Sequence, residues 1–280
     1  MIHLDMPEPE YRALPGLSGT GCAEIMKSPA HFKTSLAGRT ETPAMALGTA
    51  AHKMILEGST AFDNFYIVAG QCCSIKKDNN RCDNPAIVQS SSGHQFCGVH
   101  SKTFTDCSPT GLISADDRRI CLSMYWAIKG HRIAAALLCS PGNSEVVLTA
   151  TDPETGATVK GRVDRLPDVG PYLVDLKTTA DVLRWKPDDY LLQACHYLEL
   201  CRLNGIDRIK GVAFVVVETS DPFGVRVIVL DVEALKFGAE QLRQAWDLYA
   251  RCMETGNWPS LDRGLEVVSL SYRKMREAGA

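Results

Sequence analysis

The chain has 280 residues, of which 45% are hydrophobic, and a formal net charge of −3 at pH 7. These values fit one large or two small folded domains, and the slight negative charge excludes a general electrostatic attraction to nucleic acid. No apolar run reaches about 18 residues, the length of a membrane span, and the start MIHLDMPEPEYRALPG lacks the basic-then-apolar order of a signal peptide. We therefore expect a cytoplasmic protein with no membrane partner.

The N-terminal part is predicted to be a loop followed by two helices. Residues 1–17 are rich in proline and predicted to be loop-like, and SGTGCAEIMKSPAHF is typical of a short helix that Ser18 caps and that ends at Ser28 and Pro29. PAMALGTAAHKMILEG has Ala, Met and Leu at helical spacing and ends in glycine, which predicts a second helix with His52 in its middle.

Residues 70–105 differ in composition and are predicted to form an inserted module. They are rich in Cys, Ser, Asn and Gly, without the periodicity of a helix or long strand. Nine residues separate Cys72 from Cys82, fourteen separate Cys82 from Cys97, and two separate Cys97 from His100. Three thiolates and an imidazole suit a structural, tetrahedral Zn²⁺ site, although Cys73 could replace Cys72 and unliganded cysteines in a loop are the alternative.

From residue 114 onward the pattern alternates between helices and strands. Two helical patterns (114–138) precede three strands, SEVVLTATD, TVKGRVDRL and YLVDLKTT, and then a helix (188–205), two strands (210–218 and 224–232) and a last helix (233–254). This order predicts an α/β fold in which helices flank a central mixed β-sheet. The cysteines of these helices are expected to pack in the core: Cys121, Cys139, Cys195, Cys201 and Cys252.

Two of these strands carry charged residues. Strand alternation puts Asp175 and Lys177 on one side, and it groups Lys160, Arg162 and Asp164 in the strand before. If the strands pair through RLPDVGP, Asp164 and Asp175 approach each other, and Mg²⁺ or Mn²⁺ would relieve their repulsion. Such a site suits phosphodiester hydrolysis, with Lys177 orienting or deprotonating the nucleophile. A surface hairpin with an ordinary Asp–Lys ion pair explains this short pattern equally well.

Longer blocks favour the nuclease interpretation. GRVD (161–164), VDLKTT (174–179) and QACHY (193–197) resemble the PD-(D/E)XK nuclease superfamily. LSGTGCAEIMKSPAHF, AMALGTAAHKMILEG and TDPETGATVKGRVD are similar to blocks of RecE-like exonucleases of phages and prophages, so the resemblance covers roughly residues 14–255 outside the insert. The insert itself, with QC, C-x-N-P-A and C-x-x-H, is similar to small phage-associated zinc modules, which favours Cys72 over Cys73.

The resemblance implies roles for individual residues. His52, Asp164, Asp175 and the Leu176 carbonyl would hold the catalytic Mg²⁺ (or Mn²⁺), and Lys177 would be the catalytic lysine. Gln193 and Tyr197, which share one helical face, would border the site. Some roles stay open: Glu145 as a supporting residue, Lys160 and Arg162 as phosphate contacts or solvated charges, and Ser18 as a phosphate contact or a helix cap.

The expected protein is therefore a single nuclease domain (1–280) that contains a zinc-binding insert (70–105). The resemblance implies a homo-oligomeric exonuclease that degrades linear double-stranded DNA from the 5′ end. It would leave overhangs for recombination with a single-strand annealing protein in a bacterial or phage-infected cell. The alternatives are a non-processive nuclease of the same fold and a catalytically inactive DNA-binding or assembly protein.

Overall fold

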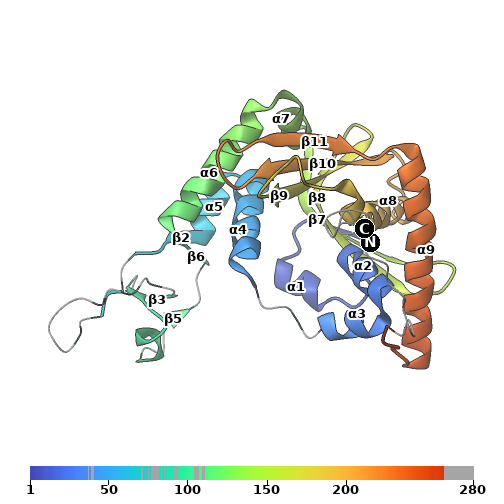
Figure 1. The fold of residues 1–280 in the computed structure, drawn as a ribbon, viewed down its shortest axis with the longest axis horizontal. Coiled ribbons are helices and arrows are strands. Elements are labelled where there is room, and N and C mark those ends of the chain that lie inside the picture. The colour runs from blue at the N-terminus through green and yellow to red at the C-terminus, as the bar shows by residue number, and fades with distance from the viewer. Residues whose placement is uncertain are drawn as a thin grey trace, which may run out of the picture.

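A mixed six-stranded sheet forms the centre of the computed structural model (Figure 1), which describes residues 1–36, 38, 41–70, 72–74, 76, 82, 84, 86, 88–90, 94–103, 107–108 and 111–261. The strand order is β1-β7-β8-β9-β10-β11. Of these neighbours, β9 and β10 run parallel, and the other pairs are antiparallel. The strands are β1 (Ile2–His3), β7 (Gly142–Thr151), β8 (Thr158–Pro167), β9 (Tyr172–Thr179), β10 (Gly211–Glu218) and β11 (Val225–Val229). The predicted α/β fold with a mixed sheet is confirmed.

One face of the sheet packs against helices from both ends of the chain. These are α2 (Gly19–Lys27), α3 (Pro29–Ser35), α8 (Leu191–Leu203) and α9 (Val232–Thr255), together with the short 3₁₀ helix η3 (Pro187–Tyr190). Their apolar side chains surround Leu148, Leu173 and Phe214 of the sheet, and Trp246 of α9 is fully buried among them. Burial of this apolar area stabilises the layer that positions α8 over β8.

A second group of helices covers the opposite face. It consists of α4 (Pro43–His52), the π-helix η1 (Lys53–Glu57), α5 (Ser59–Phe65), α6 (Ala115–Gly130) and α7 (Arg132–Cys139). Met54 and Met124 pack there against Val174 and Leu176 of β9. Since both faces of β9 and β10 are covered, these strands are nearly continuous apolar runs, in which the charges of β9 are exceptions.

Two local predictions were wrong, the loop over residues 1–17 and the burial of Cys139, whereas the predicted end of α2 at Ser28 is confirmed. Residues 1–17, predicted to be loop-like, contain β1 and the helix α1 (Glu8–Ala13), whose carbonyl end binds the ammonium group of Lys160. Directly after Ser28 a further helix, α3, begins, because Ser28 caps it and Pro29 suits its first position. Cys139 is exposed at the end of α7, beside Lys129, although the other four helical cysteines are buried.

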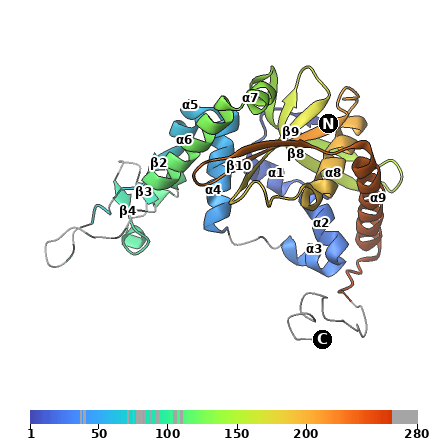
Figure 2. The same ribbon diagram turned by 45° about the horizontal axis from the view of Figure 1, so that its top comes forward.

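The insert leaves the body between α5 and α6. Its stem is the parallel pair β2 (Tyr66–Val68) and β6 (Gly111–Ile113), and beyond it lie β3 (Val88–Ser90), β4 (Gln95–Phe96), β5 (Cys107–Ser108) and the 3₁₀ helix η2 (His100–Thr103). Figures 1 and 2 show this part projecting as an arm away from the six-stranded sheet. The described residues thus include short strands that the sequence did not predict. None of the described helices combines the length and apolarity needed to cross a membrane.

Candidate active site

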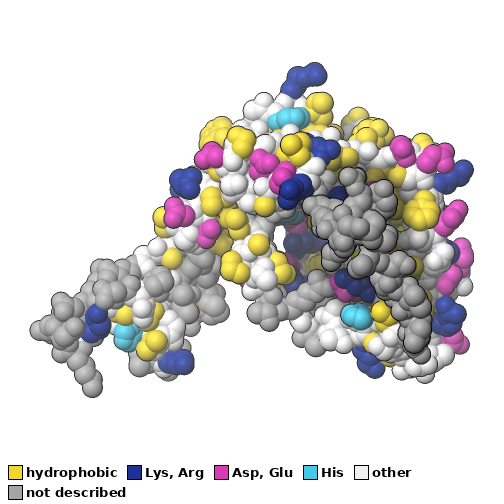
Figure 3. Space-filling view, viewed as in Figure 1, with side chains coloured by type: hydrophobic (Ala, Val, Ile, Leu, Met, Phe, Trp, Pro, Cys, Tyr) yellow, Lys and Arg dark blue, Asp and Glu magenta, His cyan; other side chains and the backbone are white. Residues whose placement is uncertain are grey.

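β8 and β9 bring the two predicted aspartates together at the centre of the sheet. The strands pair at Arg165 and Val174, and beyond this pair the backbone amide of Leu176 donates a 2.7 Å hydrogen bond to Oδ2 of Asp164. Asp164 and Asp175 are both buried. The molecular surface is hollowed between α4 and the α1–α3 region, with acidic and basic side chains visible inside (Figure 3).

His52 reaches this position from the helices on the other face. It is the last residue of α4, and the chain widens into the π-helix η1 directly after it, a distortion frequent at functional sites. Nδ1 of His52 lies 3.6 Å from Oδ2 of Asp164. Burial lowers the pKa of His52 against the opposing effect of the Asp164 charge. The neutral ring is the form that binds a metal.

Glu145 of β7 completes a group of three donors. Its backbone φ of 55° lies in the left-handed region, which is rare for residues other than glycine. Its neighbours Ser144 and Val146 pair with β8, but Glu145 itself does not. One ligand atom from each of His52, Glu145 and Asp164 lies within 4.8 Å of the others. Such backbone irregularities concentrate at functional sites, and here one accompanies the placement of a carboxylate next to Asp164 and His52.

Glu145 is costly to ionise in this position. Burial raises its pKa to about 7, the Asp164 charge adds to the rise, and Arg162 opposes it. Nε of Arg162 lies 2.6 Å from Oε2 of Glu145. One guanidinium therefore does not balance the negative charges of Glu145 and Asp164, and a further cation beside them would be favourable.

Buried Asp175 and half-buried Lys177 form an ion pair on one side of β9, as the strand alternation predicts. Asp175 Oδ2 lies 2.6 Å from Lys177 Nζ, but within the described chain neither Asp175 oxygen accepts a well-aligned hydrogen bond. Burial raises the pKa of Asp175 to about 6, with Lys177 opposing and Asp164 adding to the rise. Burial alone would lower the pKa of Lys177, but Asp175 and Asp164 outweigh it and raise the value. The two neighbouring carboxylates therefore favour the charged form of Lys177.

An aromatic stack supports the lysine. Lys177 Nζ lies 4.8 Å from the centre of the Tyr190 ring, within the range of a cation–π contact. Tyr190 stacks on Trp185 at 5.1 Å with an interplanar angle of 14°, and Trp185 packs against Phe214. The stack limits the positions open to the ammonium group. No short motif marks Tyr190 or Trp185, so the sequence did not predict their place at the site.

Gln193 and Tyr197 lie on one face of α8 and fix β8 beside the aspartates. Gln193 Nε2 donates to the Tyr197 hydroxyl (2.8 Å), which donates to the carbonyl of Arg162 (2.9 Å). Gly161 is needed for this close packing, since a Cβ there would lie 2.7 Å from Leu200 Cδ1 and 3.0 Å from the Tyr197 ring. In the structure the pair contacts the strand backbone two residues before Asp164.

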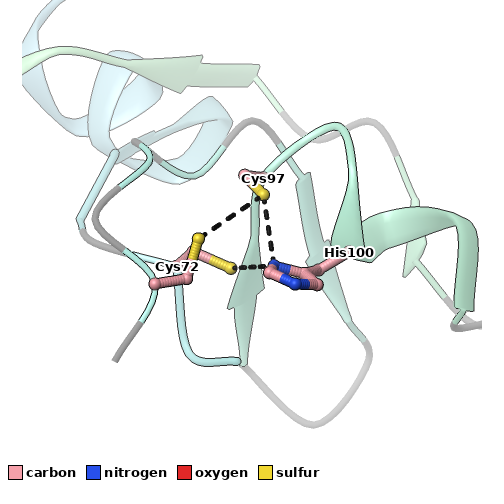
Figure 4. Close-up of side chains that lie close together, drawn as sticks. Cys72, Cys97 and His100 are labelled. Carbon is pink, nitrogen blue, oxygen red and sulfur yellow. Dashed lines mark hydrogen bonds between the residues drawn. The ribbon is translucent and has the colours of Figure 1, made fainter. Parts of the chain in front are cut away.

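The second predicted cluster is assembled in the arm. Figure 4 shows the sulfurs of Cys72 and Cys97 directed toward the ring of His100. Each of these sulfurs lies 3.4 Å from His100 Nδ1, and Cys82 Sγ lies 4.0 Å from Cys97 Sγ. All four ligand atoms lie within 4.8 Å of one another, and the three cysteines are buried. Burial opposes ionisation, but backbone hydrogen bonds around Cys97 and Ser74 lower the pKa of Cys72 to about 7. This arrangement could hold a metal ion and uses Cys72, not Cys73.

The comparison with known families agrees with the strand-borne acids and the lysine. Residues 18–266 match a family described as "PDDEXK-like domain of unknown function (DUF3799)". The chain belongs to this family. This places it in the PD-(D/E)XK nuclease superfamily, as the motifs GRVD and VDLKTT predicted.

Solved structures support the same fold. A crystal structure of a "Putative exonuclease" from Eubacterium rectale superposes with a TM-score of 0.61 and 12% sequence identity, and 98% of each chain is covered. The crystal structure of SSO0001 gives a TM-score of 0.29 with 17% identity over 46% of this chain and 55% of the other, too little to carry an argument. No protein with a curated description matches the sequence.

PD-(D/E)XK nucleases use divalent metals, and the residues present here fit one. The donors of His52, Glu145 and Asp164 converge, and Asp175 Oδ1 is a buried carboxylate oxygen without a hydrogen-bond partner among the described residues. Carboxylates with one imidazole suit Mg²⁺ or Mn²⁺ better than they suit a soft metal. Asp175 and the Leu176 carbonyl as ligands stay predictions, because Asp175 lies against Lys177 here.

The structure shows different contacts for the residues whose roles the sequence left open. Glu145 belongs to the donor group, a role that its sequence context could not reveal because the irregular backbone at this residue leaves no motif. Ser18 accepts a hydrogen bond from Gly21 N and caps α2. Lys160 binds the end of α1, whereas Arg162 lies beside Glu145.

Proposed function

We propose that this protein is a divalent-metal-dependent nuclease that hydrolyses phosphodiester bonds of DNA. The observation that carries the proposal is the convergence of His52, Glu145 and Asp164 beside the Asp175–Lys177 pair, in a fold of the PD-(D/E)XK superfamily. Acids with raised pKa values next to a charged lysine are typical of a site that handles both a metal and a phosphate.

In this proposal some residues bind the metal and another orients the phosphate. His52, Glu145 and Asp164 would hold Mg²⁺ or Mn²⁺, and Asp175 and the Leu176 carbonyl are further ligands in this proposal. A bound divalent ion would lower the pKa of a water molecule and neutralise charge on the attacked phosphate. Lys177, anchored by Asp175 and Tyr190, would orient that phosphate. Gln193 and Tyr197 would keep β8 in place through the backbone of Arg162.

The proposed substrate is the end of linear double-stranded DNA. Two resemblances support an exonuclease: the RecE-like sequence blocks, and the fold shared with the Eubacterium rectale protein that is described as a "Putative exonuclease". From the first of these we propose 5′-to-3′ degradation and a homo-oligomer. The same resemblance suggests a role in recombination with a single-strand annealing protein in the cytoplasm of a bacterial or phage-infected cell.

We also propose that the arm binds a structural Zn²⁺ through Cys72, Cys82, Cys97 and His100. The four donors form a closed set, and thiolates with an imidazole favour zinc. Among the residues of the arm that the structure describes, the apolar cluster around them consists of the cysteines with Phe96 and Val88. So small a core needs a further source of stability, which zinc would supply.

The proposed function is tested by incubating linear and closed circular duplex DNA with the protein in Mg²⁺, Mn²⁺ or EDTA. We expect metal-dependent loss of the linear DNA alone, and none with Asp164→Asn, which keeps the shape but removes the charge. Cutting of closed circles would indicate an endonuclease or a non-processive enzyme of the same fold. DNA binding in EDTA without any cleavage in either metal would indicate a DNA-binding or assembly protein.

A further inference from the structure

β8 carries two basic side chains on the side of Asp164, and their environments differ. The ammonium group of Lys160 is buried and donates to the carbonyls of Tyr11, Arg12 and Leu14 at the end of α1. A lysine has three N–H donors, so these contacts use all of them. Lys160 is therefore a structural anchor for α1 and is not free to bind DNA.

Arg162 is held beside the metal-binding group. Its Nε lies 2.6 Å from Oε2 of Glu145, one of the three converging donors, and its Nη2 lies 3.9 Å from Oε2 of Glu8 on α1. The guanidinium carbon lies 5.9 Å from the centre of the Tyr11 ring. Two acids and one ring thus position the guanidinium, whose side chain remains 24% exposed.

The geometry leaves part of the guanidinium for a ligand. An arginine has five N–H donors in a planar fork, and although Nε lies 2.6 Å from Oε2 of Glu145, that oxygen accepts no well-aligned hydrogen bond within the described chain. The contact with Glu8 is too long for a hydrogen bond, so it is a weak, partly solvated ion pair. Arginine forks bind phosphate oxygens in pairs, and here the fork lies against a residue of the proposed metal site.

We propose that Arg162 is a phosphate-binding residue, which holds a DNA phosphate next to the His52–Glu145–Asp164 group. Glu145 sets the orientation of the guanidinium, and a phosphate takes the place of the distant Glu8. This inference rests on the proposed nuclease function, since it names a further residue that contacts the same substrate. It gives Arg162 and Lys160 different roles, a distinction that the sequence alone could not make.

The test measures DNA binding, not only cleavage. Binding of a short labelled linear duplex in Mg²⁺ is followed by fluorescence anisotropy over a series of salt concentrations, with Lys177→Ala as the parent so that the DNA stays intact. Arg162→Gln is expected to weaken binding about tenfold, the loss of one charge-assisted contact, and to reduce the salt slope by about 1. The matched control is Arg202→Gln, because Arg202 also pairs with a glutamate, Glu199, but lies near the end of α8. This control should bind like the parent.

Arg162→Lys is a second test variant, in case Arg162→Gln does not fold. It keeps a positive charge beside Glu145, so it should melt at the temperature of the parent, but it lacks the fork and should bind more weakly. If Arg162→Gln does not fold, Arg162→Lys decides, and unchanged affinity overturns the inference. Unchanged affinity of a folded Arg162→Gln overturns it too, while the nuclease proposal stands if the wild type still degrades linear DNA. If the wild type cuts no DNA and the parent binds none, both proposals fail together.

Discussion

Trp246 on α9 donates a hydrogen bond from Nε1 to Nδ1 of His196 on α8, over 3.2 Å in the core. The other ring nitrogen, Nε2, lies 2.9 Å from the carbonyl oxygen of Lys160 and donates to it. Nδ1 must therefore be the acceptor, and the ring is neutral. Burial lowers the pKa of His196 to about 4. One uncharged histidine thus joins α8, α9 and β8 behind the candidate site.

This histidine predicts a loss of stability in mild acid. The unfolded chain takes up a proton near pH 6.5 and the folded chain only near pH 4, so the free energy of unfolding falls as the pH drops through this window, by about 3 kcal/mol from His196 alone. In urea unfolding, the free energy of unfolding of His196→Gln should fall less than that of the wild type as the pH drops from 6.5 to 4. The difference between the curves isolates His196 from Glu145 and Asp175, whose raised pKa values act in the opposite direction. Parallel curves would contradict the assignment.

Glu145 is predicted to be essential for metal binding although no motif marks it. Glu145→Gln should weaken Mn²⁺ binding about 10- to 100-fold in calorimetry and reduce nuclease activity in parallel. Glu154→Gln is a suitable control, because Glu154 is an exposed glutamate in the turn after β7. Equal Mn²⁺ affinity of wild type and Glu145→Gln would exclude Glu145 from the site.

Tyr190 is predicted to hold Lys177 in place through its ring. Tyr190→Phe keeps the ring and should retain most of the activity, whereas Tyr190→Leu should lower kcat about tenfold with a smaller change in KM, because the ammonium loses one of its two described contacts. Steady-state kinetics on linear duplex would measure this. Equal activity of the Phe and Leu variants would show that the stack does not position the lysine.

The arm is predicted to contain about one zinc ion per chain. Metal analysis of purified protein should find it, and Cys82→Ser should lose it. Cys73→Ser and Cys139→Ser are controls that should keep it, because neither cysteine belongs to the cluster. Zinc-free wild type, or loss of zinc from Cys73→Ser but not from Cys72→Ser, would contradict the assignment.

The cores of the arm and the body are separate, which predicts a local effect of zinc removal. Among the described residues, Cys72, Cys82 and Cys97 lie in a small apolar cluster of their own, distinct from the two clusters that cover the sheet. Chelation should therefore increase proteolysis within residues 70–105 while the melting transition of the body changes little. Loss of the whole melting transition in the chelator would show that the body depends on the arm.

The sequence predicted the parts of the structure that depend on local patterns. Alternation in YLVDLKTT placed Asp175 and Lys177 on one side of a strand, and the cysteine spacing gave the cluster in the arm. It did not predict α1, since that helix buries none of its residues and is held by Lys160, about 150 positions away in the chain. Tertiary contacts of this length leave no periodic signal.

Glu145 shows the same limit within the site. Its side chain lies beside His52 and Asp164, at a position where β7 and β8 are not paired and the backbone is left-handed. In the sequence SEVVLTATD, a glutamate looks like an ordinary strand residue. His52 could be proposed from its block of sequence, but its contact with Asp164 depends on α4 packing against β9. Donor types were therefore predictable, whereas the set that converges was not.

The decisive experiment on the active site is nucleotide release from 5′-labelled and 3′-labelled linear duplex in Mg²⁺, comparing the wild type with Lys177→Ala. We expect the wild type to release label from the 5′ end first and Lys177→Ala, folded by its melting curve, to be slower by at least about 100-fold. Release from neither end, by a wild type that binds Mg²⁺ and DNA, would contradict the claim that this site cuts DNA.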